Sequence, residues 1–425
     1  MSYRILIPDE LPYSNGVENV ASAIVEELLP QVESVTWMLQ DPERAKRIQR
    51  RLRNAENLHI IPFTQWNSAP SRTPRAGILN LLKAGLKKMP GLGRGAAAAY
   101  RNRVDSRIAS VAKETRATHC WFHFVQGQSV PRLTIPVLGL VHDQNFRFFP
   151  ENLPPGKPRQ FERALGEWLC RADLLTVLSE AGRREMLDLN NNPHPRIEII
   201  PNATTLPTTA AARPHQRKAQ PEFFYPAAAL SHKNHIALFK AAKELAEANH
   251  CFKIVLCGED TDKLVQKQPM GNAGAEQARA FYEANAQLLD PHVEALGQCS
   301  MDTVEDHYAS CSAVVLPSLY EGFGLPLVEA LARSTPVLCN RIIPFEEQVT
   351  RYAAEGWVQW FKSDHVASVV QTIQNTINHP DSLPCPPFPV KNLEAWTWKD
   401  VSARYMKLFE ELSHAEAKEE QGNET

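Results

Sequence analysis

The stretch PSLYEGFGLPLVEA, residues 317–330, combines two glutamates, two glycines and a proline directly after the apolar run AVVL at 313–316. The apolar run predicts a buried strand, and in open parallel sheets ligands bind outside the carboxyl ends of the strands. Gly322 and Gly324 allow a tight turn that exposes backbone amides, and Pro326 suits the first turn of a following helix. The free amides of such a helix start favour an anion such as a diphosphate.

Glu321 and Glu329 are the two carboxylates of this stretch. Carboxylates accept hydrogen bonds from neighbouring hydroxyl groups, which suits the diols of a sugar or a ribose. The residues alone also allow a simpler interpretation, in which a glycine turn is followed by a helix-start glutamate and an exposed partner. Both interpretations stay open at the level of this stretch.

The rest of the chain predicts two α/β domains with doubly wound parallel sheets, because short apolar runs alternate with helical patterns in two successive series. We expect a central cleft between the two Rossmann-like domains. The predicted divisions are an N-terminal domain (1–202), a linker low in periodicity (203–222), a C-terminal domain (223–394), a helix that packs back toward the N-terminal domain (395–412) and a disordered tail (413–425).

Composition excludes several classes of protein. The 425 residues carry a formal net charge of -2, which argues against nucleic acid as the main partner. The eight cysteines form no CxxC pair, so we expect reduced thiols in a cytoplasmic protein. No signal peptide is expected at the start, and no apolar run approaches the length that a membrane span needs.

The string PSLYEGFGLPLVEALA resembles the donor-site signature of the family-four type of retaining glycosyltransferases, which have the GT-B fold. The segment YPAAALSHKNHIALFKAAKEL, which starts at residue 225, is similar to the family's segment with a phosphate-binding lysine. The resemblance is strong over 225–345, weaker over 1–30 and 137–205, and absent over 40–115. A looser likeness points to bacterial members that build envelope polysaccharides.

For the donor, the resemblance implies a nucleotide diphosphate sugar bound by the C-terminal domain, 223–394, and it implies that the N-terminal domain, 1–202, binds the acceptor. Glu329 would bind the ribose hydroxyls. Glu321, together with the amides of Gly322, Phe323 and Gly324, would hold the hydroxyls of the transferred sugar.

The resemblance also implies three further site residues. Lys233 would neutralise the diphosphate, Gly16 would let the backbone approach phosphate or acceptor, and His142 would face the sugar. We expect Lys233, Glu321 and His142 to carry the catalytic roles.

The sequence departs from the family pattern at two places. Ala228 and Ala229 stand where an arginine usually provides a second phosphate clamp, which leaves open whether His232 or a residue elsewhere replaces it. Ser334 stands where a glycine is usual, and we interpret this as a structural variation.

Two other features are open to competing interpretations. Asp260 and Asp262 form an Asp-x-Asp string that could hold a metal-bound nucleotide sugar, but such strings are common as helix caps, so we expect no metal site. His142 itself could be a hydrogen-bonded structural histidine beside Asp143, and His123 is expected in the core or at its rim.

The resulting expectation is a retaining, metal-independent glycosyltransferase without a cofactor, which uses a saccharide or a lipid-linked saccharide as acceptor. The alternatives are a non-catalytic sugar-nucleotide-binding partner of a synthase complex and a nucleotide-dependent epimerase of the same fold.

A basic segment, residues 72–107, holds nine lysines and arginines against the single acid Asp105. Within it, 78–89 predicts an amphipathic helix that could lie on an anionic inner-leaflet membrane surface, and the bases of 44–53 could add to this patch. The alternative is a solvated helix that packs its apolar stripe on the first domain.

Overall fold

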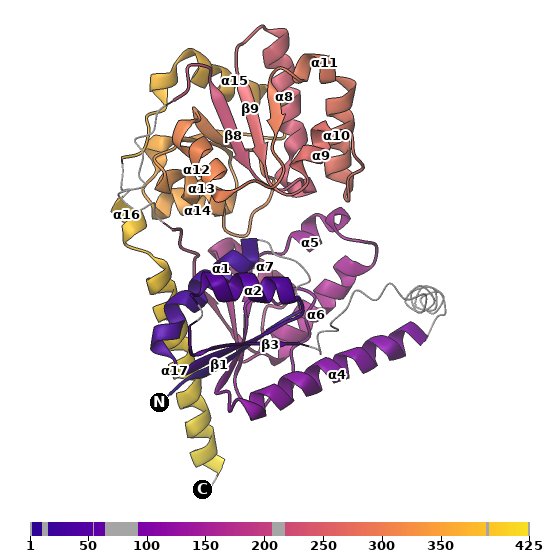
Figure 1. The fold of residues 1–425 in the computed structure, drawn as a ribbon, viewed down its shortest axis with the longest axis vertical. Helices are drawn as coiled ribbons and strands as arrows, with labels where there is room; N and C mark the ends of the chain where they lie inside the picture. Colours follow the sequence, from indigo (N-terminus) through magenta and orange to yellow (C-terminus); the bar gives the residue numbers. More distant parts are fainter. Residues whose placement is uncertain are drawn as a thin grey trace.

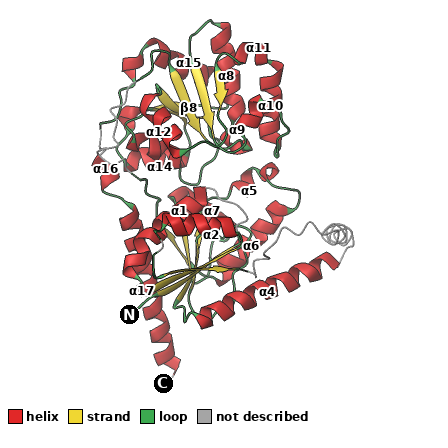
Figure 2. Ribbon diagram, in the orientation of Figure 1, coloured by secondary structure: helices red, strands yellow, loops and turns green. Residues whose placement is uncertain are grey.

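The computed structural model describes residues 2–10, 16–53, 55–63, 92–205, 217–387 and 391–423. The chain forms two α/β units, each built on a fully parallel sheet (Figure 1). Helices surround the strands of both sheets (Figure 2). The predicted fold class is confirmed.

The N-terminal sheet has seven strands in the order β3-β2-β1-β4-β5-β6-β7. Most of these strands are short apolar runs, as expected for strands covered by helices on both faces. The strands are Arg4–Asp9 (β1), Ser34–Leu39 (β2), Leu58–Pro62 (β3), His119–Phe122 (β4), Val137–Val141 (β5), Leu174–Val177 (β6) and Arg196–Ile199 (β7). The helices are Gly16–Leu28 (α1), Pro42–Arg51 (α2), Leu92–Glu114 (α4), Asn145–Phe148 (α5), Lys157–Arg171 (α6) and Glu180–Leu189 (α7).

The C-terminal sheet has six strands in the order β10-β9-β8-β11-β12-β13. The strands are Glu222–Pro226 (β8), Lys253–Cys257 (β9), Val293–Ala295 (β10), Ala313–Leu316 (β11), Val337–Asn340 (β12) and Val358–Phe361 (β13). The helices are His235–Glu247 (α8), Thr261–Val265 (α9), Ala273–Ala284 (α10), Ala286–Leu289 (α11), Met301–Ser310 (α12), Leu325–Ala332 (α13), Ile343–Arg351 (α14), Val366–Asn378 (α15) and Lys391–Glu394 (α16). A short 3-10 helix, Ser231–Lys233 (η3), follows β8.

Each sheet has one point where the strand order reverses. In the N-terminal sheet the reversal lies between β1 and β4, and in the C-terminal sheet it lies between β8 and β11. Ligands of doubly wound sheets bind in the crevice outside the carboxyl ends of the strands at such a point. The segments that follow these four strands are therefore the first places to look for a site.

The last helix, Trp398–Asn423 (α17), returns to the N-terminal domain (Figure 1). Val401, Tyr405 and Phe409 are buried in the same core cluster as residues of α1. The Tyr405 hydroxyl also lies 3.0 Å from the Thr176 hydroxyl of β6. The first domain therefore takes part of its core from the end of the chain.

Helix α17 continues to Asn423, through most of the segment after residue 412 for which the sequence predicts a disordered tail. The segment SHAEAKEEQ is rich in alanine, glutamate and lysine, which are strong helix formers, so a helix that is already nucleated by packing can extend through it.

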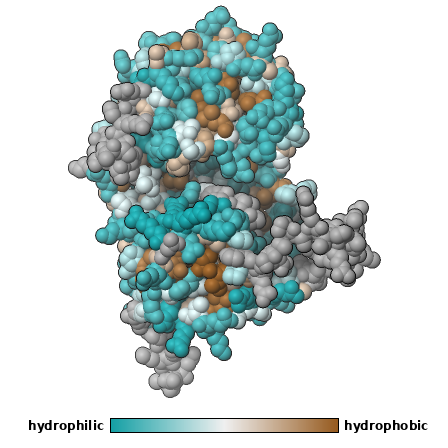
Figure 3. All heavy atoms as spheres, viewed as in Figure 1, coloured by the Kyte–Doolittle hydropathy of each residue, from teal (hydrophilic) through white to brown (hydrophobic). Residues whose placement is uncertain are grey.

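The described part of the chain contains no helix with the length and apolar character needed to cross a bilayer. The predicted amphipathic helix over 78–89 lies outside the described residues. A strongly hydrophilic surface lies over α1 and α2 (Figure 3). Lys46, Arg47 and Arg50 of α2 are exposed. Arg44 of the same helix is instead fully buried, so its predicted place in a surface patch was wrong.

Candidate active site

The carboxyl edges of the two sheets meet at the turn that follows β11. The Gly322 carbonyl accepts a hydrogen bond of 2.9 Å from the Ser179 hydroxyl, which follows β6. A Cβ atom at Gly322 would overlap the carbonyl oxygen of His142, which follows β5. The absence of a side chain at Gly322 is therefore required by contact between the domains, which the sequence analysis did not predict.

Tyr320 joins the domains beside this contact. Its hydroxyl donates to Glu185 Oε2 at 2.8 Å and accepts from the Gln144 amide at 2.8 Å. Burial raises the pKa of Glu185 to about 7. Near these bonds, the Glu347 carboxylate of α14 accepts from two backbone amides at the start of α7, at 2.9 and 3.0 Å. The two domains are thus held by hydrogen bonds on both sides of the predicted donor turn.

Lys233 and Glu321 form an ion pair across the strand-order reversal of the C-terminal sheet. The Lys233 Nζ atom lies 2.7 Å from Glu321 Oε1, and the two side chains are only 15% and 9% exposed. Lys233 ends η3 after β8, and its carbonyl accepts a 2.7 Å hydrogen bond from the Tyr225 hydroxyl. Two residues that lie 88 positions apart in the chain thus come together where a ligand of this sheet is expected.

Glu329 lies on α13, one helix turn beyond the glycine turn. Its Oε2 atom accepts a 3.1 Å hydrogen bond from the Tyr308 hydroxyl, and burial raises the pKa of its carboxyl group. Arg333 donates to the Glu329 carbonyl at 3.0 Å and lies over the Tyr308 ring at 5.0 Å. The carboxylate is therefore oriented from one side and keeps acceptor capacity for hydroxyl groups.

The remaining glycine-turn residues shape the backbone. Gly324 has a φ of 90° and a Cβ atom there would lie 2.7 Å from the Phe345 ring, so both conformation and space favour glycine. The Phe323 side chain is buried in the C-terminal core. Gly16 begins α1, and a Cβ atom there would meet no described atom within 4 Å. Packing against the described residues therefore does not explain the glycine at position 16.

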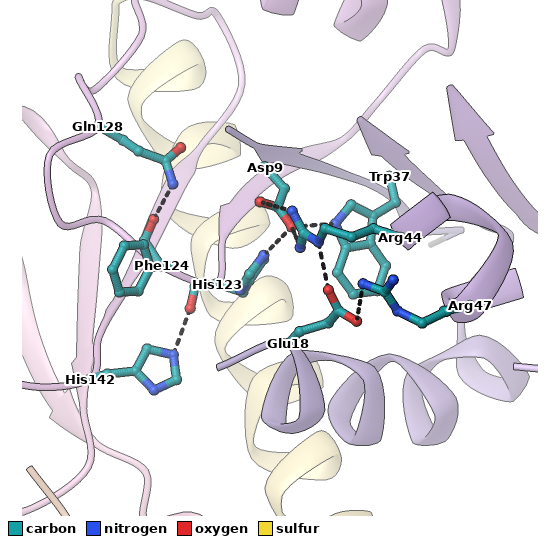
Figure 4. Close-up of polar contacts among 9 residues, drawn as sticks. All are labelled: Asp9, Glu18, Trp37, Arg44, Arg47, His123, Phe124, Gln128 and His142. Atoms are coloured by element: carbon teal, nitrogen blue, oxygen red, sulfur yellow. Dashed lines mark hydrogen bonds and ion pairs between the residues drawn. The ribbon is translucent and has the colours of Figure 1, made fainter. Parts of the chain in front are cut away.

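His142 is buried at the carboxyl end of β5 (Figure 4). Its Nε2–H donates to the His123 carbonyl at 2.8 Å, so the neutral ring has Nδ1 as a hydrogen-bond acceptor. Burial lowers the pKa of His142 to about 4. At neutral pH this side chain can accept a hydrogen bond from a hydroxyl group, but it does not provide a positive charge.

A buried polar network behind His142 was missed by the sequence analysis. His123, which is 1% exposed as expected for a core residue, donates from Nε2 to Asp9 Oδ2 at 2.9 Å. Arg44 binds Asp9 at 2.7 Å and Glu18 at 2.6 Å (Figure 4). Burial by itself would raise the pKa of Asp9, but His123 and Arg44 hold it below the usual value. The network ties β1, α1 and α2 to the segment that follows β4.

His232 does not replace the arginine that is missing beside Lys233. Ala229 is buried, and its amide and carbonyl bind Glu259 and Asn272. Burial lowers the pKa of His232 to about 2, and its Nδ1 accepts from Asn152 at 3.0 Å. His232 is therefore neutral and cannot act as a second cationic clamp.

The Asp-x-Asp string lies at the start of α9. Asp260 precedes the helix with a φ of 63° and pairs with Lys263 at 2.7 Å, whereas Asp262 lies beside Gly297. Within the described ranges, no group of three or more His, Cys, Asp or Glu side chains is arranged to hold a metal ion. The string acts locally as part of a helix start.

A family model described as "Glycosyl transferases group 1" matches residues 209–382. The O-antigen chain mannosyltransferase B of Escherichia coli is 26% identical over 217 residues, which cover 49% of this chain and 54% of that protein. The O-antigen chain mannosyltransferase RfbU of Salmonella typhimurium is 28% identical over 169 residues, which cover 40% of this chain and 42% of that protein. The chain thus spans about half the length of the curated relatives it matches.

The structure of Anabaena Alr3699/HepE in complex with UDP and glucose is similar across the whole chain. It has a TM-score of 0.63 and 14% identity, and the match covers 96% of this chain and 100% of that one. Two other structures, both of glycosyltransferases, match with TM-scores of 0.65 and 0.62. These findings confirm the resemblance that the glycine turn indicated. Residues 209–382 are thus similar to the glycosyl transferases group 1 domain, and the two parallel-sheet domains have a GT-B fold.

Proposed function

We propose that the chain is a retaining glycosyltransferase that moves a sugar from a nucleotide diphosphate sugar to the hydroxyl of a saccharide acceptor. The ion pair between Lys233 and Glu321 is the observation that carries this proposal. A cation that can neutralise a leaving diphosphate and a carboxylate that can accept from sugar hydroxyls lie 2.7 Å apart. The transferred sugar and the leaving diphosphate are bonded to each other, so the site needs the cation and the carboxylate close together.

In this proposal the site residues orient the donor and stabilise the charge on the departing phosphate. As the glycosidic bond breaks, negative charge grows on the departing phosphate, and a preorganised ammonium group stabilises that charge. Glu321 fixes the sugar, Glu329 binds the ribose hydroxyls, and His142 accepts from a sugar hydroxyl through Nδ1. In the proposed retaining reaction the acceptor hydroxyl attacks on the face that the leaving group departs from, and the departing phosphate takes its proton.

The two alternatives predict different products. A non-catalytic sugar-nucleotide-binding partner needs no group that stabilises charge on a leaving phosphate, so the cation of Lys233 beside Glu321 supports the transferase. The deciding experiment measures release of nucleoside diphosphate with and without a saccharide acceptor. Acceptor-dependent release supports the transferase. Binding without release points to the partner, and a donor sugar converted to its epimer without release points to an epimerase.

We propose mannose as the first sugar to test, because both named relatives are mannosyltransferases of O-antigen chains. A thermal-shift panel of nucleotide sugars identifies the donor, since the preferred one stabilises the folded state by mass action. NMR of the product linkage then tests retention at the anomeric carbon. Inversion would contradict the retaining assignment and leave the transferase assignment intact.

We propose that the reaction needs no metal ion and no cofactor. The proposed site neutralises the diphosphate through Lys233, and Asp260 is already paired with Lys263. Activity is expected to survive a strong chelator. Its loss on chelation, followed by recovery with manganese or magnesium, would reverse this assignment.

We further propose that the chain works at the anionic inner leaflet of a membrane and takes a lipid-linked saccharide. The exposed bases Lys46, Arg47 and Arg50 of α2 support this, since they can contact an anionic surface. Flotation with liposomes should require anionic lipid and should weaken as salt rises. Flotation that ignores lipid charge would contradict electrostatic docking.

A further inference from the structure

Two cysteines meet at the carboxyl edge of the C-terminal sheet. Cys257 is the last residue of β9, and Cys299 lies 42 positions further along the chain, after β10. Their Sγ atoms lie 2.6 Å apart. A disulfide bond needs a separation of about 2 Å, so a small movement is enough to join the two sulfur atoms. Because the two residues are far apart in the chain, the CxxC spacing considered in the sequence analysis does not detect this pair.

Backbone hydrogen bonds between the two strand ends hold the cysteines together. The Leu296 amide donates to the Leu256 carbonyl at 2.8 Å, one residue before the first cysteine. The Gly258 amide, one residue after that cysteine, donates to the Gly297 carbonyl at 2.8 Å. Gly297 has a φ of 65°, a conformation that favours glycine, and the second cysteine follows two residues later. The contact between the sulfur atoms thus comes from the ordered ends of two neighbouring strands.

The two thiols differ in their access to solvent. Cys257 is 6% exposed, and burial raises the pKa of its thiol to about 12. Cys299 is partly exposed. A dissolved oxidant therefore reaches Cys299 first, and Cys257 lies where it can react with the oxidised sulfur. An accessible cysteine beside a second cysteine that resolves it is typical of reversible redox sites.

We propose that Cys257 and Cys299 form a site of reversible oxidation, with a peroxide as oxidant and a dithiol as reductant. The Cys299 thiolate attacks one oxygen of hydrogen peroxide, so that the O–O bond breaks, a sulfenic acid forms and hydroxide leaves with the proton of the thiol as water. The Cys257 thiol then attacks the sulfenic sulfur, so that the S–S bond forms, the S–O bond breaks and a second water leaves.

The balance of this step is two thiols oxidised by two electrons and one peroxide reduced to two waters. A dithiol reverses it by thiol–disulfide exchange and is itself oxidised to a disulfide. In a reducing compartment such a bond persists only while oxidant is present. The site therefore responds to the oxidant and is not a permanent cross-link.

The bond would join two segments that support the proposed donor site. The residue after Cys257 is Gly258, where a Cβ atom would lie 2.6 Å from the carbonyl carbon of Ala227, directly after β8. The residue after Cys299 is Ser300, whose side chain caps α12. Closing the loop between the cysteines restricts the unfolded chain, so the oxidised C-terminal domain should resist unfolding more than the reduced one. This consequence does not depend on the proposed glycosyl transfer.

The test treats the reduced full chain with hydrogen peroxide and then maps its disulfides by mass spectrometry without reduction. Trypsin with endoproteinase Asp-N separates Cys299 from Cys311, because Asp302 lies between them. A cross-linked peptide that contains Cys257 and Cys299 should appear. The melting temperature should rise by about 5 °C or more, and dithiothreitol should reverse both changes.

Cys299→Ser and Cys257→Ser should each abolish the cross-linked peptide and the rise in melting temperature. The matched control is Cys251→Ser, because Cys251 is an exposed cysteine of the same domain, ahead of β9. It should keep both changes. If Cys257→Ser does not fold, the partly exposed position of Cys299→Ser still decides the result.

Four outcomes would overturn the inference. They are the absence of the cross-linked peptide from the peroxide-treated wild type, its formation without a rise in melting temperature, a rise that Cys299→Ser retains, and a cross-link between Cys311 and Cys385 in its place. Oxidation of Cys299 that stops at a sulfinic acid counts as the first of these, because dithiothreitol does not reverse it.

Discussion

Gly322 and the carbonyl oxygen of His142 pack so closely that a methyl group on Gly322 would overlap that oxygen. The contact joins the turn after β11 to the end of β5, and thereby sets the distance between the two proposed halves of the site. The Ser179 hydroxyl holds the same turn at 2.9 Å. A glycine that resembles a ligand-binding feature in the sequence is thus also the place where the domains touch.

Gly322→Ala should therefore push the domains apart while each domain stays folded. Misplacement of reacting groups by about 1 Å can lower the rate by roughly 10²-fold, so kcat/KM should fall by about that factor. Small-angle scattering should report a more open chain. Gly356→Ala is the control, because a Cβ atom there meets nothing within 4 Å. Full activity of Gly322→Ala would show that this contact is not needed in the reacting state.

Lys233→Ala should lower kcat by roughly 10² to 10³, the range for removing one stabilising group from a developing anion. Donor affinity should fall less, because charge on the leaving diphosphate grows toward the transition state. Lys233→Ala also leaves the Glu321 carboxylate buried without its ion-pair partner. Lys233→Arg, which keeps the positive charge, is therefore the comparison. Thermal unfolding checks that both variants fold. Equal losses in donor affinity and rate would indicate ground-state binding only.

Glu329→Gln should weaken binding of the nucleoside diphosphate by roughly 1 to 3 kcal/mol, because a charged acceptor of ribose hydroxyls becomes a neutral one. Tyr308→Phe removes the 3.1 Å hydrogen bond to the same carboxylate and should have a smaller effect. Calorimetric titration of both variants checks this order. Unchanged affinity of Glu329→Gln with a normal fold would remove Glu329 from the donor site.

Glu185 should make stability depend on pH. Because its pKa is raised to about 7 in the folded state, the folded chain binds its proton more tightly than the unfolded chain. This contribution is present below the ordinary glutamate pKa and is lost as pH rises toward about 7. Glu185→Gln keeps an acceptor for the Tyr320 hydroxyl without ionising, so its melting temperature should vary less with pH from 5 to 7.5. Parallel melting curves of the two proteins would contradict the assignment.

Ser334→Gly should stabilise the chain. Ser334 has a φ of 58°, a left-handed conformation that costs a residue with a Cβ atom roughly 1 kcal/mol relative to glycine. Its buried Oγ atom also has no hydrogen-bond partner among the described residues. Denaturant unfolding should show a gain of about 1 kcal/mol. A loss of stability would mean that the hydroxyl group has a role that the geometry does not reveal.

The turn after β11 could be predicted because its chemistry is local. Glycines, a proline and two carboxylates lie within one short stretch, and a strand-turn-helix segment places them without help from distant residues. The pairing of Glu321 with Lys233 follows from the order of β8 and β11 in the sheet. That order could be expected for this fold, but no short window of sequence contains it.

The network of Asp9, Glu18 and Arg44 could not be predicted in the same way. A single arginine within a basic helix resembles a surface residue, and only tertiary packing shows that it lies against two buried carboxylates. The burial that keeps His142 neutral has the same origin. Charges that depend on desolvation are properties of the packed molecule, and their sequence signal is weak.

Helix α17 has a consequence for how the protein is made. The first domain precedes the second in the chain, yet Val401, Tyr405 and Phe409 belong to its core. A ribosome must therefore synthesise almost the whole polypeptide before that core can close. The N-terminal domain therefore cannot complete its core before the C-terminal domain has been synthesised. A nascent chain that stops before α17 should be a substrate for chaperones and proteases.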